Sequence, residues 1–306
     1  MLRHYISIAR PDHWFKNIFM LPGIIMAIIY AKPELSQDLV INLIAGIFAT
    51  CLIASSNYVI NEWLDAEFDK YHPVKKNRPS LVANLNPVII YLEYAFLALA
   101  GLSLSLVISP WFALTEAVFL MMGFMYNVKP LRTKEKAFMD VITESINNPI
   151  RFILGWMIII TLPFPPSSIL IAYWMGGAFL MATKRLAEYR FIGDPDKARQ
   201  YRKSFNYYNE NRLLISIFFY AICSAFFLGI FLIKYRIELL ISFPFIALLF
   251  AWYLKIGFEE NSIVQTPEKL YKKKKFILYI VFLFCLLIFL FLADIEWFTW
   301  FLKKIN

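Results

Sequence analysis

The chain has 306 residues, of which 60% are hydrophobic and only 17% are charged. Ordinary soluble domains are about 45–50% apolar and about 25% charged, so this composition excludes a soluble protein and predicts several membrane spans. The formal net charge is +9. Because basic loops orient membrane proteins and face anionic lipid, this charge does not indicate a nucleic-acid partner.

Apolar runs long enough to cross a bilayer, which takes about 20 residues, recur along the whole chain. No low-complexity linker interrupts them, so residues 1–306 are expected to form one domain. The predicted fold class is all-α, a bundle of about nine transmembrane helices around a central cavity that opens to the cytoplasm. The candidate spans are residues 15–31, 39–62, 88–109, 111–127, 138–162, 167–184, 211–233, 238–257 and 276–302.

The distribution of Lys and Arg predicts the orientation of these spans. If the N-terminus is cytoplasmic, the N-terminal segment and the loops on its side, with their membrane boundaries, hold 25 of the 31 basic residues. The opposite face holds five, and cytoplasmic loops are the ones enriched in basic residues. We therefore expect a multi-pass protein of the cell membrane with a cytoplasmic N-terminus and its C-terminus on the opposite side.

The segment RPDHWFKN, residues 10–17, precedes the first span. Physical chemistry alone favours an interfacial belt, with Trp14 among the headgroups and Arg10 and Lys16 on lipid phosphates. The alternative is that Lys16 and Asn17 belong to a functional site.

A row of polar side chains ends the second span. Asn57, Asn61, Asp65 and Asp69 are spaced four apart, so on a helix they share one stripe. Polar groups at this position are costly unless they face a cavity, a partner or an ion. Side-chain oxygens in a row suit Mg²⁺, which keeps waters and bridges to substrate phosphates. The simpler alternative is a solvated helix end of mixed charge.

The basic segment DKYHPVKKNRP, residues 69–79, follows directly. It supplies His72, Lys75 and Arg78, and cations of this kind bind phosphates. The sequence therefore predicts a site for a phosphorylated substrate beside the carboxylates.

These residues carry a resemblance. Asn61, Glu62, Asp65 and Asp69 resemble the first motif, N-D-x-x-D-x-x-x-D, of the UbiA superfamily of intramembrane prenyltransferases, with Glu62 where the pattern has Asp. The continuation D-x-x-H-P-x-K-x-x-R-P is similar to the branch of decaprenyl-phosphate phosphoribosyltransferases. The N-terminal pattern R-P-x-x-W-x-K-N is also similar to the start of that branch, and this resemblance implies a site role for Lys16 and Asn17.

Two later loops extend the resemblance. YNVKPLRTKEK, residues 126–136, resembles the superfamily pattern Y-S-x-x-P-x-R-x-K, and its basic residues, among them Lys129, Arg132 and Lys134, either clamp a phosphate or only set topology. After the sixth span the chain lacks the second motif, D-x-x-x-D, of most members. It has Lys184, Arg185 and Glu188 instead, similar to K-R-x-x-E of the phosphoribosyltransferase branch; Lys184 and Glu188 alternatively form a pair on the helix surface.

The fifth span carries ionisable residues in FMDVITESINNPIRFILGW, residues 138–156, and departs here from the more apolar phosphoribosyltransferase branch. Asp140, Glu144 and Asn148 are spaced four apart, and Arg151 lies close to the same face. Either an Asp140/Glu144–Arg151 network joins helices, or this face lies opposite the aspartate stripe and Asn148 and Arg151 reach phosphate or sugar hydroxyls. Pro149 is expected to kink the span.

Together these patterns predict an Mg²⁺-dependent integral membrane transferase that takes a polyprenyl lipid and a diphosphate-bearing donor. The first hypothesis is transfer of 5-phosphoribose from phosphoribosyl diphosphate to polyprenyl phosphate, with Asn61, Asp65 and Asp69 as catalytic residues that hold Mg²⁺. One alternative is prenyl transfer from a prenyl diphosphate to an aromatic acceptor. The other is an ion-coupled transporter. The predicted substrate-binding residues are Lys16, Asn17, Asn57, His72, Lys75, Arg78, Lys129, Arg132, Asp140, Glu144, Asn148, Arg151, Lys184, Arg185 and Glu188.

Overall fold

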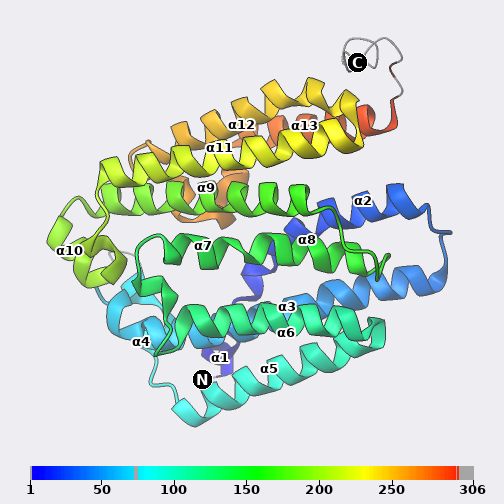
Figure 1. The fold of residues 1–306 in the computed structure, drawn as a ribbon. Coiled ribbons are helices and arrows are strands. Elements are labelled where there is room, and N and C mark those ends of the chain that lie inside the picture. Colours follow the sequence, from blue (N-terminus) through cyan, green and yellow to red (C-terminus); the bar gives the residue numbers. More distant parts are fainter. Residues whose placement is uncertain (1, 72–74, 294, 296–306) are drawn as a thin grey trace. The chain divides into compact units, whose positions relative to one another are not determined.

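The computed structural model describes residues 2–71, 75–293 and 295 of the chain (Figure 1). Within this described part the secondary structure is entirely helical, and no residue lies in a strand. The predicted all-α fold class is confirmed.

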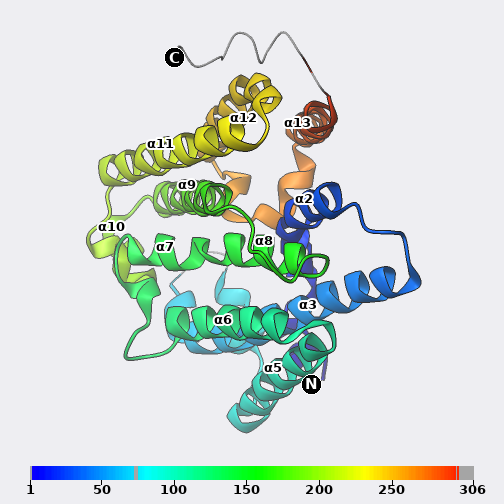
Figure 2. The same cartoon turned by 45° about the vertical axis from the view of Figure 1, so that its right-hand side comes forward.

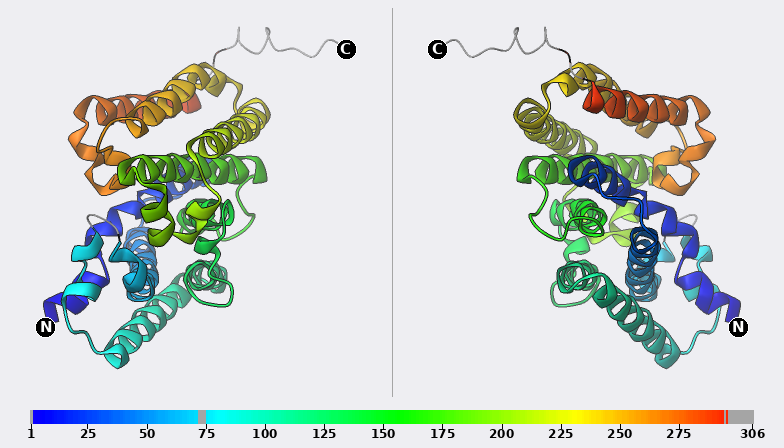
Figure 3. Two further views of the ribbon diagram at one scale, coloured as in Figure 1. Left: turned by 90° about the vertical axis from the view of Figure 1, so that its left-hand side faces the viewer. Right: turned by 90° about the vertical axis from the view of Figure 1, so that its right-hand side faces the viewer.

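The chain falls into two compact units. The first comprises Met1–Pro165 and Ile192–Asn209, and the second comprises Pro166–Phe191 and Glu210–Asn306. The single domain expected from the sequence stays a prediction. The main helices of the first unit, coloured from blue to green in Figure 3, are α1 (Leu2–Ile8), η1 (Pro11–Met20), α2 (Leu21–Ala31), α3 (Gln37–Asp69), α4 (Pro79–Val82), α5 (Pro87–Ile108), α6 (Pro110–Asn127), α7 (Met139–Ser145) and α8 (Asn147–Met157), joined by η2 (Lys75–Asn77) and η3 (Thr133–Glu135), with α10 (Pro195–Tyr201) and η4 (Lys203–Asn206) from later in the chain.

Helix α3 occupies the middle of the first unit. It begins at a side-chain cap, because Ser36 Oγ accepts a hydrogen bond from Leu39 N at 3.1 Å. It then runs unbroken for 33 residues. Helices α5 and α6 pack against it, and Figure 2 shows α6 alongside α3. They form a hairpin at Ser109, which ends α5 and caps α6.

Helices α2 and α8 approach each other at two glycines. A Cβ atom on Gly23 would lie 2.1 Å from the carbonyl oxygen of Phe152, and one on Gly155 would lie 2.2 Å from that of Met20. The two backbones therefore touch, as small residues allow in membrane helices. Buried apolar side chains fill the core around this contact; they include Met20, Ile24, Ile53, Phe112, Phe119, Leu154 and Met157.

The fifth span is interrupted near the predicted kink, and the bend itself stays a prediction. Helix α7 ends at Ser145 and α8 begins at Asn147, so the helix is interrupted at Ile146. Proline lacks an amide hydrogen and its ring clashes with the carbonyl four residues earlier, which for Pro149 is that of Ser145.

The second unit contains four long helices, α9 (Ser167–Ile192), α11 (Glu210–Tyr235), α12 (Phe243–Gly257) and α13 (Lys274–Leu292), with the shorter η5 (Ile237–Ser242), η6 (Ile263–Gln265) and η7 (Pro267–Lys272). Ser224 Oγ of α11 donates to the Ala172 carbonyl of α9 at 2.9 Å. Tyr279 of α13 donates to the Phe245 carbonyl of α12, also at 2.9 Å.

Helix occupies each of the nine predicted span ranges within the described residues. Six helical segments there have the length and apolar composition to cross a membrane: Arg3–Ala31, Gln37–Asp69, Pro87–Ile108, Glu210–Tyr235, Ile237–Gly257 and Lys274–Leu292. The other three ranges correspond to α6, to the α7–α8 pair and to α9. The count of nine spans stays a prediction, and most of the last range beyond residue 293 lies outside the described residues.

Candidate active site

The four polar residues of the second span lie on one continuous helix. Asn57, Asn61, Asp65 and Asp69 all belong to α3, whose last residue is Asp69. Asn57 and Asp69 are buried, and Asn61 and Asp65 are partly buried. The sequence spacing therefore does place these groups on one stripe, running from the core of the first unit to the end of the helix.

Asp65 is held by two cations from the loop after α6. The Lys134 ammonium contacts Asp65 Oδ1, and Arg132 Nη2 donates to the same oxygen at 3.2 Å. Among the described residues, Oδ2 of Asp65 has no partner. Lys134 is 5% exposed, and burial lowers the pKa of its ammonium to about 8 although Asp65 acts in the opposite direction.

Asn127, the last residue of α6, connects this cluster to the rest of the stripe. Its Oδ1 accepts hydrogen bonds from Lys134 Nζ at 2.7 Å and from Asn61 Nδ2 at 2.5 Å. Its main-chain carbonyl accepts from Arg132 Nη1 at 3.0 Å. Lys134, Asn127, Asn61 and Asp65 thus form one connected polar network.

Two members of this network were not among the predicted site residues. Lys134 stands two positions after Arg132 in the same basic loop, so the loop motif contains the signal that finds it. Asn127 is a lone amide at the end of an apolar run, and its role follows only from the fold. Lys129, which was predicted as a phosphate clamp, is exposed.

Asp69 and the segment after α3 form a second basic cluster. Asp69 is 2% exposed and is ion-paired with Arg78. Lys75 donates a hydrogen bond to the Tyr201 hydroxyl of α10, and its ammonium lies 4.8 Å from the centre of that ring. The predicted phosphate-binding cations Lys75 and Arg78 therefore lie at the same end of α3 as the carboxylates. His72 lies outside the described residues.

Glu62, the residue that departs from the aspartate motif, does not join the stripe. Its side chain is 2% exposed and pairs with Arg10, whose Nε donates to Glu62 Oε2 at 2.8 Å. Arg10 has φ 50° and ψ 60°, the left-handed region that non-glycine residues rarely occupy. The buried ion pair therefore fixes the bend between α1 and η1.

The remaining residues of the N-terminal motif also contact α3. Trp14 Nε1 donates to Ser55 Oγ at 2.8 Å, and Asn17 Nδ2 lies 3.1 Å from Cys51 Sγ. Lys16 Nζ lies 5.3 Å from the centre of the Tyr58 ring. Arg10 and Trp14 therefore bind protein groups, whereas the predicted site role of Lys16 and Asn17 stays a prediction.

Replacing Glu62 with Gln tests its separation from the metal ligands. Breaking a buried ion pair costs about 3–5 kcal/mol, and because Gln keeps one hydrogen bond we expect a smaller loss, about 1–3 kcal/mol, seen as a lower thermal midpoint in detergent. The Mg²⁺ concentration that half-saturates activity should stay unchanged. Asp12→Asn is a matched control, since the Asp12 side chain is 72% exposed. A raised Mg²⁺ requirement in Glu62→Gln alone would show that Glu62 is a ligand.

The ionisable residues of the fifth predicted span separate into two groups. Asp140 on α7 is fully buried and accepts hydrogen bonds from Tyr208 at 2.7 Å and from Ser204 at 3.2 Å. Arg151 on α8 instead binds Asn17. Within the described part of the chain no carboxylate lies within 4 Å of Arg151, so the predicted Asp140/Glu144–Arg151 network is wrong. Helix α7 turns toward residues 201–208, and the break at Ile146 separates it from α8. Glu144 and Asn148 are partly buried.

The second unit holds the remaining predicted residues on α9. Arg185 Nη1 donates to Glu188 Oε2 at 2.7 Å, and both side chains are buried. Lys184 is partly buried one residue earlier. Glu188 is buried and bonded to Arg185, so it does not lie on the helix surface, and the pairing of Lys184 with Glu188 stays a prediction.

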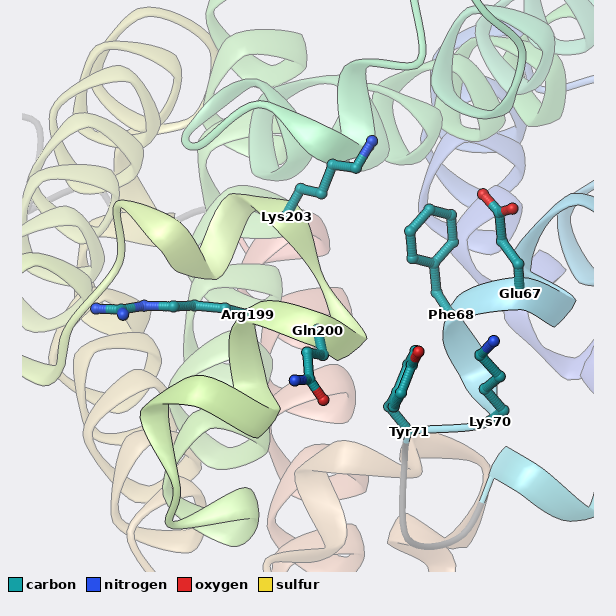
Figure 4. A pocket seen from close by; sticks show the side chains of 7 residues that line it. All are labelled: Glu67, Phe68, Lys70, Tyr71, Arg199, Gln200 and Lys203. Carbon is teal, nitrogen blue, oxygen red and sulfur yellow. The ribbon is translucent and has the colours of Figure 1, made fainter.

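A cavity of about 460 Å³ lies beside the end of α3 (Figure 4). Lys203, one of its lining residues, donates to Glu135 at 2.9 Å. No described member of the predicted site lines this cavity, so it is separate from the aspartate stripe. Its lining residues are Glu67, Phe68, Lys70, Tyr71, Arg199, Gln200 and Lys203.

The side chains of the stripe fit a magnesium ion by their chemistry. The described residues contain no group of three or more His, Cys, Asp or Glu that could hold a metal by themselves. Mg²⁺, however, is usually held in enzymes by one or two carboxylates together with waters and substrate phosphates. Asp65, with its Oδ2 available, and Asp69 and Asn61 on the same stripe match that requirement.

Comparison with known sequences gives one family and several relatives. The sequence model of the UbiA prenyltransferase family matches residues 19–262. The chain is 29% identical over 184 residues to decaprenyl-phosphate phosphoribosyltransferase of Mycolicibacterium smegmatis, covering 60% of this chain and 56% of that protein. It is 26% identical over 183 residues to the enzyme of that name from Mycobacterium tuberculosis, covering 60% and 59%. The match spans little more than half the length of these relatives.

Solved structures with the same fold cover nearly the whole chain. A UbiA homolog from Archaeoglobus fulgidus bound to GPP and Mg²⁺ matches with a TM-score of 0.69 at 19% identity, covering 93% of this chain and 99% of that one. A structure of digeranylgeranylglyceryl phosphate synthase matches with a TM-score of 0.61 at 15% identity, covering 95% and 96%. At these identities the likeness establishes the fold.

Proposed function

This chain belongs to the UbiA prenyltransferase family, and from that premise we propose that it transfers 5-phosphoribose from phosphoribosyl diphosphate to a polyprenyl phosphate. Family membership makes it a multi-pass membrane transferase. The finer proposal rests on the similarity to decaprenyl-phosphate phosphoribosyltransferases. It also rests on the replacement of a second aspartate motif by the K-R-x-x-E residues of α9.

The observation that carries the proposal is the cationic surrounding of the two carboxylates. Asp65 is bound by Lys134 and Arg132, and Asp69 is bound by Arg78. Arg132 also pairs with Glu135 at 2.7 Å, so these three cations face three carboxylates, and Lys75 adds one further positive charge at this end of α3. Such a cluster suits a polyanion such as a diphosphate, because charge-assisted hydrogen bonds to phosphate are strong.

In the proposed reaction a bound Mg²⁺, held by Asp65, Asp69 and Asn61, would neutralise the diphosphate and make it a better leaving group. Lys134 and Arg132, already placed at Asp65, stabilise the negative charge that develops as the diphosphate departs. Asn127 fixes the orientation of Asn61 by accepting its amide hydrogen. The donor phosphates are assigned to Lys75 and Arg78.

The bond changes need no strong general base. An oxygen of the lipid phosphate attacks the anomeric carbon while the bond from that carbon to the diphosphate oxygen breaks. The attacking phosphate is already an anion, so no proton has to be removed from it. The buried setting of Asp69 and Lys134 keeps water away from the oxocarbenium-like carbon, which would otherwise be hydrolysed.

We also propose a cytoplasmic N-terminus and a C-terminus on the opposite side, from the Lys and Arg distribution. In this orientation the end of α3 and the loops after α6 and α9 lie on the cytoplasmic side. A soluble phosphorylated donor could then reach the site directly.

A second candidate function is prenyl transfer to an aromatic acceptor. The observation in its favour is that a UbiA homolog of the same fold from Archaeoglobus fulgidus was solved with GPP and with DMAPP, each together with Mg²⁺. The aspartate stripe would bind the donor diphosphate in either reaction. The transporter hypothesis is set aside, because the family that this chain belongs to is one of transferases.

A two-arm product assay on purified protein with Mg²⁺ tests the proposal. The first arm supplies polyprenyl phosphate and phosphoribosyl diphosphate labelled in its ribose, and the second supplies labelled prenyl diphosphate with a pool of aromatic acceptors. We expect label to enter the lipid phase in the first arm, with release of diphosphate. Product only in the second arm would establish the prenyl-transfer alternative, and the absence of product in both would reject the two together.

A further inference from the structure

Arg151 lies in a part of the first unit that is otherwise packed with apolar side chains. Its helix, α8, is buried along nearly its whole length, including Ile150, Phe152 and Leu154 on either side of it. The arginine itself is 7% exposed. A guanidinium in such surroundings is costly unless something compensates its charge.

No carboxylate of the described residues forms an ion pair with this guanidinium. Arg151 Nε donates to Asn17 Oδ1 at 2.9 Å and Nη1 to the Asn147 carbonyl at 3.3 Å, while the guanidinium lies 4.6 Å from the centre of the Phe119 ring. All three partners are neutral. Glu116 of the neighbouring helix α6 interacts electrostatically with Arg151, but its hydrogen bond comes from Thr50 and it forms no ion pair with the guanidinium within 4 Å. Among the described residues the guanidinium therefore has no directly bonded anionic partner.

One edge of this guanidinium is open. Nη2 of Arg151 has no hydrogen-bond partner among the described residues, and it is not among the fully enclosed polar atoms, so this atom is accessible from outside the protein. Asn147 Oδ1, on the preceding turn of the same helix, is buried and without a partner in the described part. The guanidinium of Arg151 can bind an anion through Nη2, and Asn147 Oδ1, one helical turn away, can accept a hydrogen bond. This pair therefore suits an anion that also carries a hydroxyl group.

This position is separate from the aspartate stripe. Asn17, the partner of Arg151, contacts Cys51, and Asn57 Nδ2 donates to the carbonyl of Phe119. Cys51 and Asn57 precede Asp65 on α3 by 14 and 8 residues. At a rise of 1.5 Å per residue, Cys51 and Asn57, which mark the position of Arg151 along α3, lie roughly 12 to 21 Å from Asp65 along the helix axis. One diphosphate held at Asp65 therefore does not neutralise Arg151.

We propose that Arg151 is the anchor of a second anion site, which binds the phosphate monoester of a substrate, with Asn17 positioning the guanidinium. The inference rests on the proposed function, which supplies two such groups: the phosphate of the polyprenyl lipid and the 5-phosphate of the ribosyl donor. Prenyl transfer to a neutral aromatic acceptor supplies none. A second anion site thus separates the two candidate functions by chemistry.

The test compares ligand pairs that differ by the phosphate monoester. Binding to full-length protein with Mg²⁺ is measured for polyprenyl phosphate against polyprenol, and for phosphoribosyl diphosphate against inorganic diphosphate. We expect the wild type to prefer the phosphate monoester in one pair, and that pair identifies its source. Arg151→Met should reduce this preference about tenfold or more, the scale of one charge-assisted contact. Arg151→Lys should retain part of it.

Thermal unfolding of the same variants distinguishes a binding role from a structural one. Because Arg151→Met removes a buried charge that forms no ion pair, we expect its unligated thermal midpoint to be unchanged or raised. The phosphate ligand should raise the midpoint of the wild type and not that of the variant. Arg190→Met is the control, since Arg190 is 41% exposed in a surface pair with Glu210; it should keep the wild-type preference.

The outcomes also separate this inference from the proposed function. If the wild type prefers neither phosphate monoester, or if Arg151→Met keeps the wild-type preference, the second anion site is refuted. If the preference depends on Arg151 but the wild type transfers no ribosyl phosphate in the product assay, the anion site stands and the proposed reaction fails.

Discussion

Asp65→Asn is expected to lower the Mg²⁺-dependent kcat/KM by about a hundredfold to a thousandfold, the range found when one electrostatic contact that stabilises developing charge is lost. Asn keeps the size and one oxygen of the side chain but removes its charge. The metal then loses its central ligand, and Lys134 and Arg132 lose the anion that places them. Turnover of both candidate donors should be measured over a range of Mg²⁺ concentrations, together with thermal unfolding.

Glu67→Gln is the matched control for this variant. Glu67 also lies near the end of α3, but it is exposed and faces the separate cavity of Figure 4. Its turnover should stay within about twofold of the wild type, as for most surface substitutions. If Asp65→Asn folds and keeps its Mg²⁺-dependent turnover, the metal assignment to the stripe is wrong for both candidate reactions.

Gly155→Ala is expected to have the largest effect on folding. The added methyl would lie 2.2 Å from the carbonyl oxygen of Met20, a main-chain atom that no side-chain rotation can move. Overpacking a close-packed core usually costs about 1–3 kcal/mol and sometimes more, and contact with a rigid backbone places this variant at the upper end. We expect a strongly reduced yield of monodisperse protein in detergent and a lower thermal midpoint.

Gly229→Ala provides the contrast within another long helix, α11. A Cβ atom there would meet no described atom within 4 Å. Alanine is the better helix former by about 1 kcal/mol, so this variant should be as stable as the wild type or slightly more stable. Equal stability of the two variants would show that α2 and α8 do not touch at these glycines.

The fold could be predicted well from the sequence because its signal is local. Each apolar run by itself predicts one helix, and capping residues such as Ser36 and Ser109 mark where helices begin. The division into two units could not be predicted, since it depends on which helices pack together. Three predicted spans, those of α6, of the α7–α8 pair and of α9, are not among the six segments with the length and apolar composition to cross a membrane. Their helices are short, interrupted or charged.

The candidate site could be predicted only in part, for a similar reason. A spacing of four placed Asp65 and Asp69 correctly, because helical periodicity is a property of one segment. Partners distant in sequence were missed or wrong. Glu62 and Arg10 are 52 positions apart, and Lys134 is 69 positions from its partner Asp65. Such pairs form when distant segments pack together, and no local pattern in one sequence predicts which residues will meet.

The length of α3 links the chemistry of this protein to the thickness of its membrane. Thirty-three residues make a rod of about 50 Å, whereas the hydrocarbon of a bilayer is about 30 Å thick. The apolar part of α3 ends near Ile60, so Asp65 and Asp69 extend beyond the acyl chains. A hydrated ion therefore reaches these carboxylates without crossing the hydrocarbon layer. A thicker bilayer would draw these carboxylates into the headgroups or force the helix to tilt. Under the proposed function, the lipid composition of the host membrane would therefore influence the rate of catalysis.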